Sequence, residues 1–182
     1  MADVSRRRKK KQLRDERISR DVLRCGGSIL RSEYFKKAAF ETHHLRSSVY
    51  DHSLTVCITA VQICLVLRKI GLRINEKDLI QASLCHDLGM VGRSQKFHRS
   101  FEAWRGHAND SAFIAQKLIP ELSENAECMI RTHMWPVSGS YPRSREAFIL
   151  NAADKYASIA DWVYFLTGRR TGGQIRSELE RE

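Results

Sequence analysis

The stretch "LCHDLG" at residues 84–89 places a histidine beside an aspartate in a segment that is otherwise apolar. The apolar neighbours of His86 and Asp87 predict a helix that buries most of its circumference. Burying an ionised carboxylate next to an imidazole is costly unless another group pairs with both of them. The pair therefore predicts that a partner is buried with it.

Four further polar side chains stand on or beside apolar faces of predicted helices. His133 lies on the buried stripe of its helix, and Asp154 lies among alanines in the middle of an apolar helix. His52 and His107 stand near the starts of two other helices. Each has a simpler interpretation: a hydrogen-bonded histidine at a helix end for His52, a cap or surface residue for His107, and a salt bridge to an arginine for Asp154.

Together these residues offer four imidazoles and two carboxylates. Nitrogen and oxygen ligands without a thiolate suit transition metals such as Fe, Mn, Co, Ni or Zn, whereas Mg and Ca prefer oxygen alone. Six ligands exceed what one catalytic metal with an open position takes, so the set predicts two metals bridged by one carboxylate. The six residues are His52, His86, Asp87, His107, His133 and Asp154.

The elements that must position these side chains are predicted to be helices. Pro and Gly are scarce, and apolar residues recur at helical rather than alternating spacing, so we expect an all-α protein without strands. Asn75 and Ser144 are expected to cap two helices, and Gly89 is expected to end the helix that precedes it. The expected helices span residues 3–24, 31–40, 48–70, 76–88, 107–118, 121–134 and 144–166.

Residues 89–106 are expected to form a loop that is long for a compact helical domain and rich in cations. Long loops of this kind more often bind ligands than support packing. For each cation, a solvated surface charge is an equally good interpretation. His44 and Arg46 are weaker candidates for contacting a substrate. The stronger candidates for binding an anionic group of a substrate are Arg93, Lys96, Arg99 and Lys155.

The formal net charge of +10 is concentrated in residues 1–24, which hold ten Lys or Arg against four Asp or Glu. The run "RRRKKKQLR" (6–14) is expected to be solvated, and nucleic acid binding through it is less favoured because it lacks aromatic side chains for stacking on bases. No apolar run is expected to reach the ~18 residues of a membrane span. Five cysteines without a CxxC pair indicate reduced core thiols. We therefore expect a cytoplasmic protein without a membrane partner.

The order H, then HD, then H, H and D resembles the HD-domain superfamily of metal-dependent phosphohydrolases in its two-metal form. The resemblance covers roughly residues 30–166 and rests on "VYDHS", "LCHDLG", "GHANDSA", "IRTHMWP" and "NAADKYAS". It implies a compact helical bundle, which we expect over residues 25–168. A basic extension, helical or disordered, would precede it (1–24), and a short exposed tail would follow it (169–182).

Carried over to this sequence, the family pattern implies a role for each of the six residues. A first metal would be held by His52, His86, Asp87 and Asp154. Asp87 would bridge to a second metal, completed by His107 and His133. Asp87 and His86 would be the catalytic residues. The metals expected from the donor set are Fe or Mn, with Co, Ni or Zn also compatible.

The activity that the resemblance implies is hydrolysis of a phosphate ester or anhydride, in a nucleotide or small phosphorylated metabolite, by a hydroxide bridging two metals. Met90 and Val91 stand where guanosine tetraphosphate hydrolases carry a Glu-Asp pair, so that activity is not expected. Two alternatives stay open. One is a di-iron oxygenase with the same order of ligands, and the other is a non-catalytic module that binds nucleic acid or another partner. The oligomeric state is not predicted.

Overall fold

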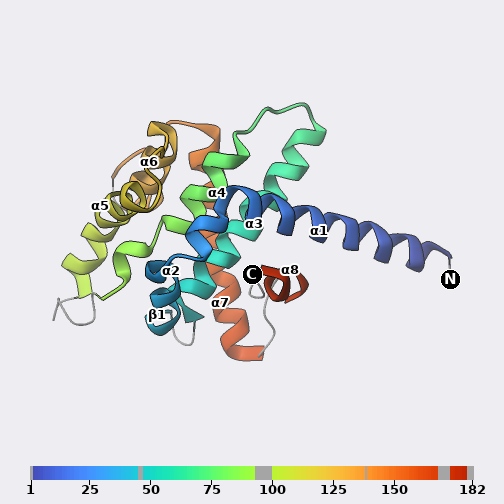
Figure 1. The fold of residues 1–182 in the computed structure, drawn as a ribbon, viewed down its shortest axis with the longest axis horizontal. Helices are drawn as coiled ribbons and strands as arrows, with labels where there is room; N and C mark the ends of the chain where they lie inside the picture. The colour runs from blue at the N-terminus through green and yellow to red at the C-terminus, as the bar shows by residue number, and fades with distance from the viewer. Residues whose placement is uncertain (1, 45–46, 93–99, 138, 168–172, 180–182) are drawn as a thin grey trace.

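The structure is a computed structural model, and it describes residues 2–44, 47–92, 100–137, 139–167 and 173–179. Within these residues the fold is all-α, as the sequence predicts, with one short hairpin (Figure 1). The α-helices are α1 (Ala2–Leu30), α2 (Glu33–Lys37), α3 (Val49–Lys69), α4 (Glu76–Cys85), α5 (Ser100–Leu118), α6 (Glu124–Thr132), α7 (Arg145–Thr167) and α8 (Gly173–Leu179).

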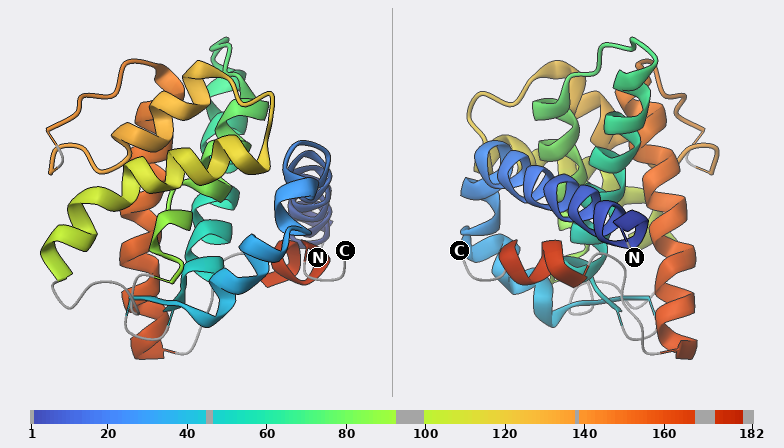
Figure 2. Two further views of the ribbon diagram at one scale, coloured as in Figure 1. Left: turned by 60° about the vertical axis from the view of Figure 1, so that its left-hand side comes forward. Right: turned by 90° about the vertical axis from the view of Figure 1, so that its right-hand side faces the viewer.

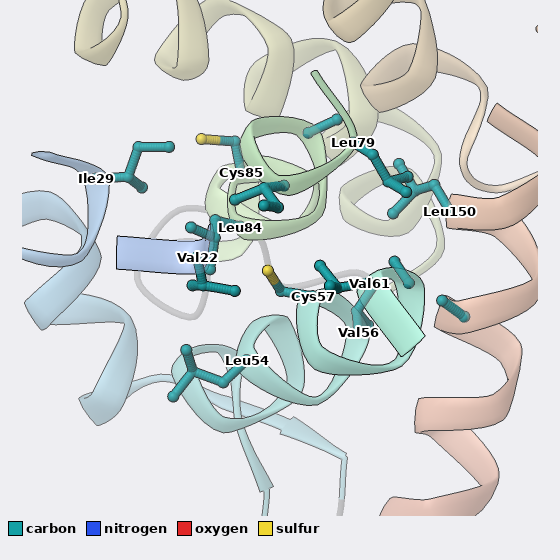
Figure 3. Packing of buried hydrophobic residues seen from close by; sticks show 14 of the residues in the cluster. Val22, Ile29, Leu54, Val56, Cys57, Val61, Leu79, Leu84, Cys85 and Leu150 are labelled. Atoms are coloured by element: carbon teal, nitrogen blue, oxygen red, sulfur yellow. The ribbon is translucent and has the colours of Figure 1, made fainter. Parts of the chain in front are cut away.

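Helices α3 and α4 pack against each other at the centre of the bundle. Both also contact α1 and α7, while α5 and α6 pair with each other and pack on α4 (Figures 1 and 2). The apolar core lies where these helices meet, and Figure 3 shows Val22 of α1, Leu54 of α3 and Leu84 of α4 pointing into it. The core therefore joins helices from both halves of the chain around α3 and α4.

Helix caps fall where the sequence predicts them. The Asn75 side chain accepts a hydrogen bond from the backbone N–H of Asp78 at 3.2 Å, and Ser144 accepts one from Ala147 at 3.2 Å. Both bonds satisfy N–H groups that a helix start leaves without a partner inside the helix.

The cysteines are free, as expected. Cys57, Cys64 and Cys85 are buried, and Cys25 and Cys128 are half-buried. Burial raises the pKa of the Cys85 thiol to about 12 and also raises that of Cys57. These thiols therefore act as apolar packing groups.

Helix α3 is long and apolar enough to cross a membrane by composition alone, with a hydropathy of 1.5 over its most apolar window. The prediction that no apolar segment reaches this length was therefore wrong. In the structure, 67% of that window is buried inside the protein. The hydropathy of α3 thus has a structural explanation, because this helix packs on α1, α4 and α7 in the core.

The region before α3 contains a feature that the sequence did not predict. Strands β1 (Thr42–His44) and β2 (Ser47–Ser48) pair antiparallel, so the expectation of no strand was wrong here. Strands of three and two residues are too short to show an alternating pattern. The helix expected at 31–40 is also divided, into α2 and the 3₁₀ helix η1 (Ala38–Phe40).

Helix α4 ends at Cys85, three residues before the predicted end, and His86 is its C-cap. The chain then forms the 3₁₀ helix η2 (Leu88–Met90). Gly89 lies inside η2 and has no positive φ, so the prediction that it ends the helix was wrong. A Cβ at Gly89 would lie 2.4 Å from the backbone oxygen of His107. Glycine is needed there because α5 approaches η2 closely.

Helix α5 begins at Ser100 and runs through Gly106, so the expected loop at 89–106 is shorter than predicted. Arg93, Lys96 and Arg99, three of the candidates for binding phosphate, lie outside the described residues, as does Arg46.

The C-terminal segment is not simply an exposed tail, because residues 173–179 form α8, which packs on α1. Ile175 and Leu179 are buried. The guanidinium of Arg176 lies 3.1 Å from the Asp51 carboxylate and donates to the Asp51 backbone oxygen at 2.7 Å. This contact fixes α8 to the first turn of α3. The sequence has too few apolar residues here to indicate such packing.

The basic N-terminal run is helical, and its side chains from residues 3 to 14 are exposed. Helix α1 projects from the bundle over this part and enters it further along, where Ile18 and Val22 are buried (Figure 1). The sequence predicted a helix ending near residue 24, and the structure extends it to Leu30.

Candidate metal centre

The six side chains selected from the sequence meet in one place, although they come from five segments of the chain. His52 lies in the first turn of α3, and His107 lies within α5. His86 and His133 are the C-caps of α4 and α6, where each chain turn directs the ring inward. Asp87 follows His86, and Asp154 lies near the middle of α7. The four imidazoles and Asp87 are buried, and the Asp154 side chain is 16% exposed.

Asp87 lies between two pairs of histidines and turns one carboxylate oxygen toward each pair. Its Oδ2 is 3.3 Å from Nε2 of His86 and 3.7 Å from Nε2 of His52. Its Oδ1 is 3.2 Å from Nε2 of His107 and 3.4 Å from Nε2 of His133. One carboxylate thus divides the centre into two halves.

Asp154 completes the half that contains His52 and His86. Its Oδ1 is 3.0 Å from Nε2 of His52 and 3.7 Å from Nε2 of His86. The predicted alternative, a salt bridge from Asp154 to an arginine, is not found among the described residues. Its contacts are with these two imidazoles instead.

The other ring nitrogen of three histidines is fixed by a hydrogen bond. Nδ1 of His86 donates to the Ser83 backbone oxygen at 2.9 Å, and Nδ1 of His133 donates to the Ile130 oxygen at 2.7 Å. Nδ1 of His52 donates to Oδ2 of Asp161 at 3.0 Å. A neutral imidazole that donates from Nδ1 presents a lone pair at Nε2. In this neutral form, all three histidines would turn an Nε2 lone pair toward the carboxylates of the centre.

The electrostatics of the first half favour positive charge there. Burial lowers the pKa of His52, but its hydrogen bonds to Asp154 and Asp161 outweigh burial and raise that pKa to about 9. Burial likewise lowers the pKa of His86, and the charges of Asp87 and Asp154 outweigh it and raise that pKa to about 10. Burial would raise the pKa of Asp154, but its bonds to the two imidazoles hold it well below its usual range.

Two observations indicate that the donor set fits metal ions. Nε2 of His86 is buried and has no hydrogen-bond partner, which is costly for a polar atom unless something else binds it. Nε2 of His107 and Nε2 of His133 face each other at 3.1 Å, an arrangement that two lone pairs favour only around a cation or a shared proton. The first observation concerns the half that contains His86, and the second concerns the half that contains His107 and His133.

The spacing of the ligand atoms agrees with this interpretation. Two atoms that bind one ion at about 2.1 Å lie about 3.0–3.4 Å apart in octahedral or tetrahedral geometry. The shortest contact in the first half is 3.0 Å, and the contacts of Oδ1 of Asp87 in the second half are 3.2 and 3.4 Å. His52, His86 and Asp154 form one group able to hold a metal, and His86, Asp87 and His133 form another.

A family model described as the HD domain matches residues 49–159, which is more than half of the chain. The chain belongs to the HD-domain family. The matched segment begins three residues before His52 and ends five residues after Asp154, so it contains all six residues. Comparisons with curated proteins and with solved structures give no match.

Lys155 follows Asp154 on α7, and its exposed side chain is held by two hydrogen bonds. Its Nζ donates to the Trp135 backbone oxygen at 2.7 Å and to Oδ1 of Asn151 at 2.6 Å. Asn151 in turn donates to the His133 backbone oxygen at 2.6 Å. Asn151 and Lys155 thus hold the chain that follows His133, and binding of substrate phosphate by Lys155 stays a prediction.

Asp161 contacts a histidine of the centre and was not among the residues predicted from the sequence. It lies on α7 seven residues after Asp154, which places both carboxylates on the same face of that helix two turns apart. His52 lies between them, with Nε2 toward Asp154 and Nδ1 toward Asp161. The spacing was available as a signal, but only the position of His52 gives it a meaning.

We expect Asp161→Asn to weaken metal binding in the half that contains His52 by about 10- to 100-fold, because the carboxylate fixes the tautomer of His52 and raises its basicity. Asparagine keeps the shape but removes the charge. The measurement is metal retained per chain during titration with a chelator. Asp3→Asn, on the exposed start of α1, is the matched control and should retain metal like the wild type. Equal retention by the Asp161 variant would rule out this role.

Proposed function

We propose that this HD domain hydrolyses a phosphate ester or anhydride in a nucleotide or similarly small phosphorylated metabolite. The observation that carries the proposal is the position of Asp87, whose two oxygens face two separate groups of imidazoles. His52, His86 and Asp154 would hold one divalent transition metal, and His107 and His133 would hold the second. Fe or Mn are the ions we favour for this donor set.

Two ions held this way would acidify a water molecule and neutralise charge on phosphoryl oxygens. The protein's own contribution is positional. Asp87 keeps the two halves at a fixed separation, and the backbone carbonyls of Ser83 and Ile130 orient His86 and His133. Because these groups are buried and held by helix ends, they need little rearrangement when a substrate enters.

In the proposed reaction, cationic side chains around the centre bind the substrate's phosphate. Among the residues that the structure describes, the candidate is Lys155, because it is the residue directly after Asp154 on α7. Burial lowers the pKa of Lys155, and the charge of Asp154 partly opposes that effect. Arg93, Lys96 and Arg99, on the segment after η2, are proposed as further phosphate ligands.

The test is phosphate release by purified protein freed of metal and reloaded separately with Mn, Fe(II), Co, Ni or Zn. The substrates are nucleoside mono-, di- and triphosphates, sugar phosphates and a chromogenic phosphate ester, assayed with and without oxygen. We expect release from at least one of them with Mn or Fe(II) in the absence of oxygen. No release with any metal would contradict the proposal, and turnover that requires both iron and oxygen would favour an HD-type oxygenase instead.

A further inference from the structure

The outer face of α7 carries an apolar stripe that, except for Lys155 at the edge nearest Asp154, the centre does not use. Exposed side chains recur on it at alternating spacings of four and three residues, which is the spacing of a seam between packed helices. In Figure 2, α7 stands along one edge of the molecule in the right-hand view. The members of this stripe, which we call the α7 seam, are Phe148, Ala152, Lys155, Ile159, Trp162 and Leu166.

The α7 seam is large for a surface that stays in water. Ile159 is 64% exposed, Trp162 57% and Leu166 75%, and no described segment covers them. With Tyr156 and Val163 beside the seam, the exposed apolar side chains of this face present roughly 700 Å² on typical side-chain areas, more than the largest patch of most monomers. Such an area is close to the ~800 Å² that each partner buries in a standard interface.

We propose that the α7 seam is the interface of a homodimer, in which α7 of one copy packs antiparallel on α7 of the other. The chain carries a net charge of +10 that is concentrated in residues 1–24, so two copies repel each other where these segments approach. The seam carries no acidic residue and one cation, Lys155, whose ammonium group is held by Trp135 and Asn151. Two copies therefore meet there with little like-charge repulsion.

The antiparallel direction follows from the order of side chains along the seam. A two-fold axis through its middle places Phe148 opposite Leu166, and Ala152 opposite Trp162, so that the smallest residue faces the largest. The same axis places Lys155 opposite Ile159. A parallel pair would instead bring Lys155 against Lys155 and Trp162 against Trp162. Antiparallel packing also brings the helix dipoles into opposition, which is favourable.

The dimer would affect the centre through α7, although the second copy would contribute no residue to it. Helix α7 carries Asp154 and Asp161, which contact His52, on a different face from the seam. A second copy packed on the outer face would restrain the helix that holds both carboxylates. This inference does not depend on the proposed hydrolysis, because it concerns association alone.

The experiment is sedimentation equilibrium of the full chain over a range of concentrations. We expect a species of twice the 21.0 kDa chain mass for the wild type. Trp162→Glu and Leu166→Glu should each weaken association at least 100-fold, because each places a charge in the seam. Val66→Glu is the matched control, since Val66 is 60% exposed on α3, and it should leave the dimer intact. Circular dichroism verifies that the variants are folded.

Ile159 tests the direction of packing. In the antiparallel dimer Ile159→Glu faces Lys155 of the second copy and should be tolerated better than Ile159→Lys by at least tenfold in dissociation constant. A wild type that is monomeric at all concentrations overturns the proposal, as does a dimer that Trp162→Glu leaves unchanged. A monomer that binds vesicles through this face, and loses binding in the same variants, would also overturn it and assign the seam to a lipid surface.

Discussion

Asp87→Ala is expected to leave the protein folded but unable to hold metal in either half of the centre. Asp87 is the one of the six side chains whose two ligand atoms face different groups of histidines. Without it the two halves lose their common ligand, and the four imidazoles lose a negative charge that offsets bound cations. The measurements are metal content per chain and the rate of phosphate release.

The size of the effect can be estimated from the charge that two ions would neutralise. Their stabilisation of phosphoryl charge amounts to several kcal/mol, which corresponds to a loss of about 1,000-fold in rate or more. Asp87→Asn gives a finer test, because its single oxygen can face only one half. That variant should retain at most one metal per chain.

Asp3→Ala is the control for both variants, since Asp3 pairs with Arg7 on the exposed start of α1. It should keep the metal content and the rate of the wild type. Phosphate release that survives Asp87→Ala would show that the activity arises elsewhere or from a contaminant, and two metals retained by this variant would contradict the bridging role.

The six residues could be selected from the sequence because a buried polar side chain interrupts the apolar pattern of its helix. His86, His133 and Asp154 interrupt apolar helical patterns, and each interruption requires a compensating partner wherever the helix packs. The structure brings all three together with His52, Asp87 and His107. Their division into two halves came from the resemblance to HD domains, because periodicity alone does not say which imidazole faces which carboxylate oxygen.

Asp161 shows what such patterns cannot supply. It stands among exposed and apolar residues near the end of α7, and nothing in its spacing separates it from an ordinary surface aspartate until His52 is placed beside it. The same holds for Arg176, whose contact with Asp51 joins residues 125 positions apart. Contacts of this kind depend on how helices distant in sequence are packed, and local patterns carry little information about that.

The ends of helices were also predicted poorly from the sequence, and the segment after His86 shows why. Gly89 was expected to stop α4 through its backbone freedom, the usual role of a glycine after a helix. In the structure it serves tertiary packing, because its Cα lies against the backbone of α5. The sequence shows that residue 89 is a glycine, but it does not show which neighbouring backbone leaves no room for a larger residue.

Gly89→Ala is therefore expected to destabilise the protein and to disturb the half of the centre that contains His107. The new Cβ would lie 2.4 Å from the His107 backbone oxygen and 2.8 Å from the Ser111 backbone nitrogen. Neither atom can rotate away, so α5 must shift as a unit. The hydrogen bond from the Gly89 backbone N–H to the Ser111 hydroxyl, now 2.8 Å, would lengthen as well. Overpacking of this kind costs about 1–3 kcal/mol.

The measurements are urea unfolding of the metal-free protein and metal content of the reloaded protein. We expect a lower unfolding midpoint, with loss of the ion held by His107 and His133 before the ion held by His52 and His86, because Asp87 and His107 lie on the two segments forced apart.

Gly71→Ala is the matched control. A Cβ there meets nothing within 4 Å, so only its φ of +83° is unfavourable, at a cost of about 1–2 kcal/mol. This control should lower stability without changing metal content. Retention of both metals by Gly89→Ala at wild-type stability would show that α5 does not need this glycine to bring His107 to Asp87.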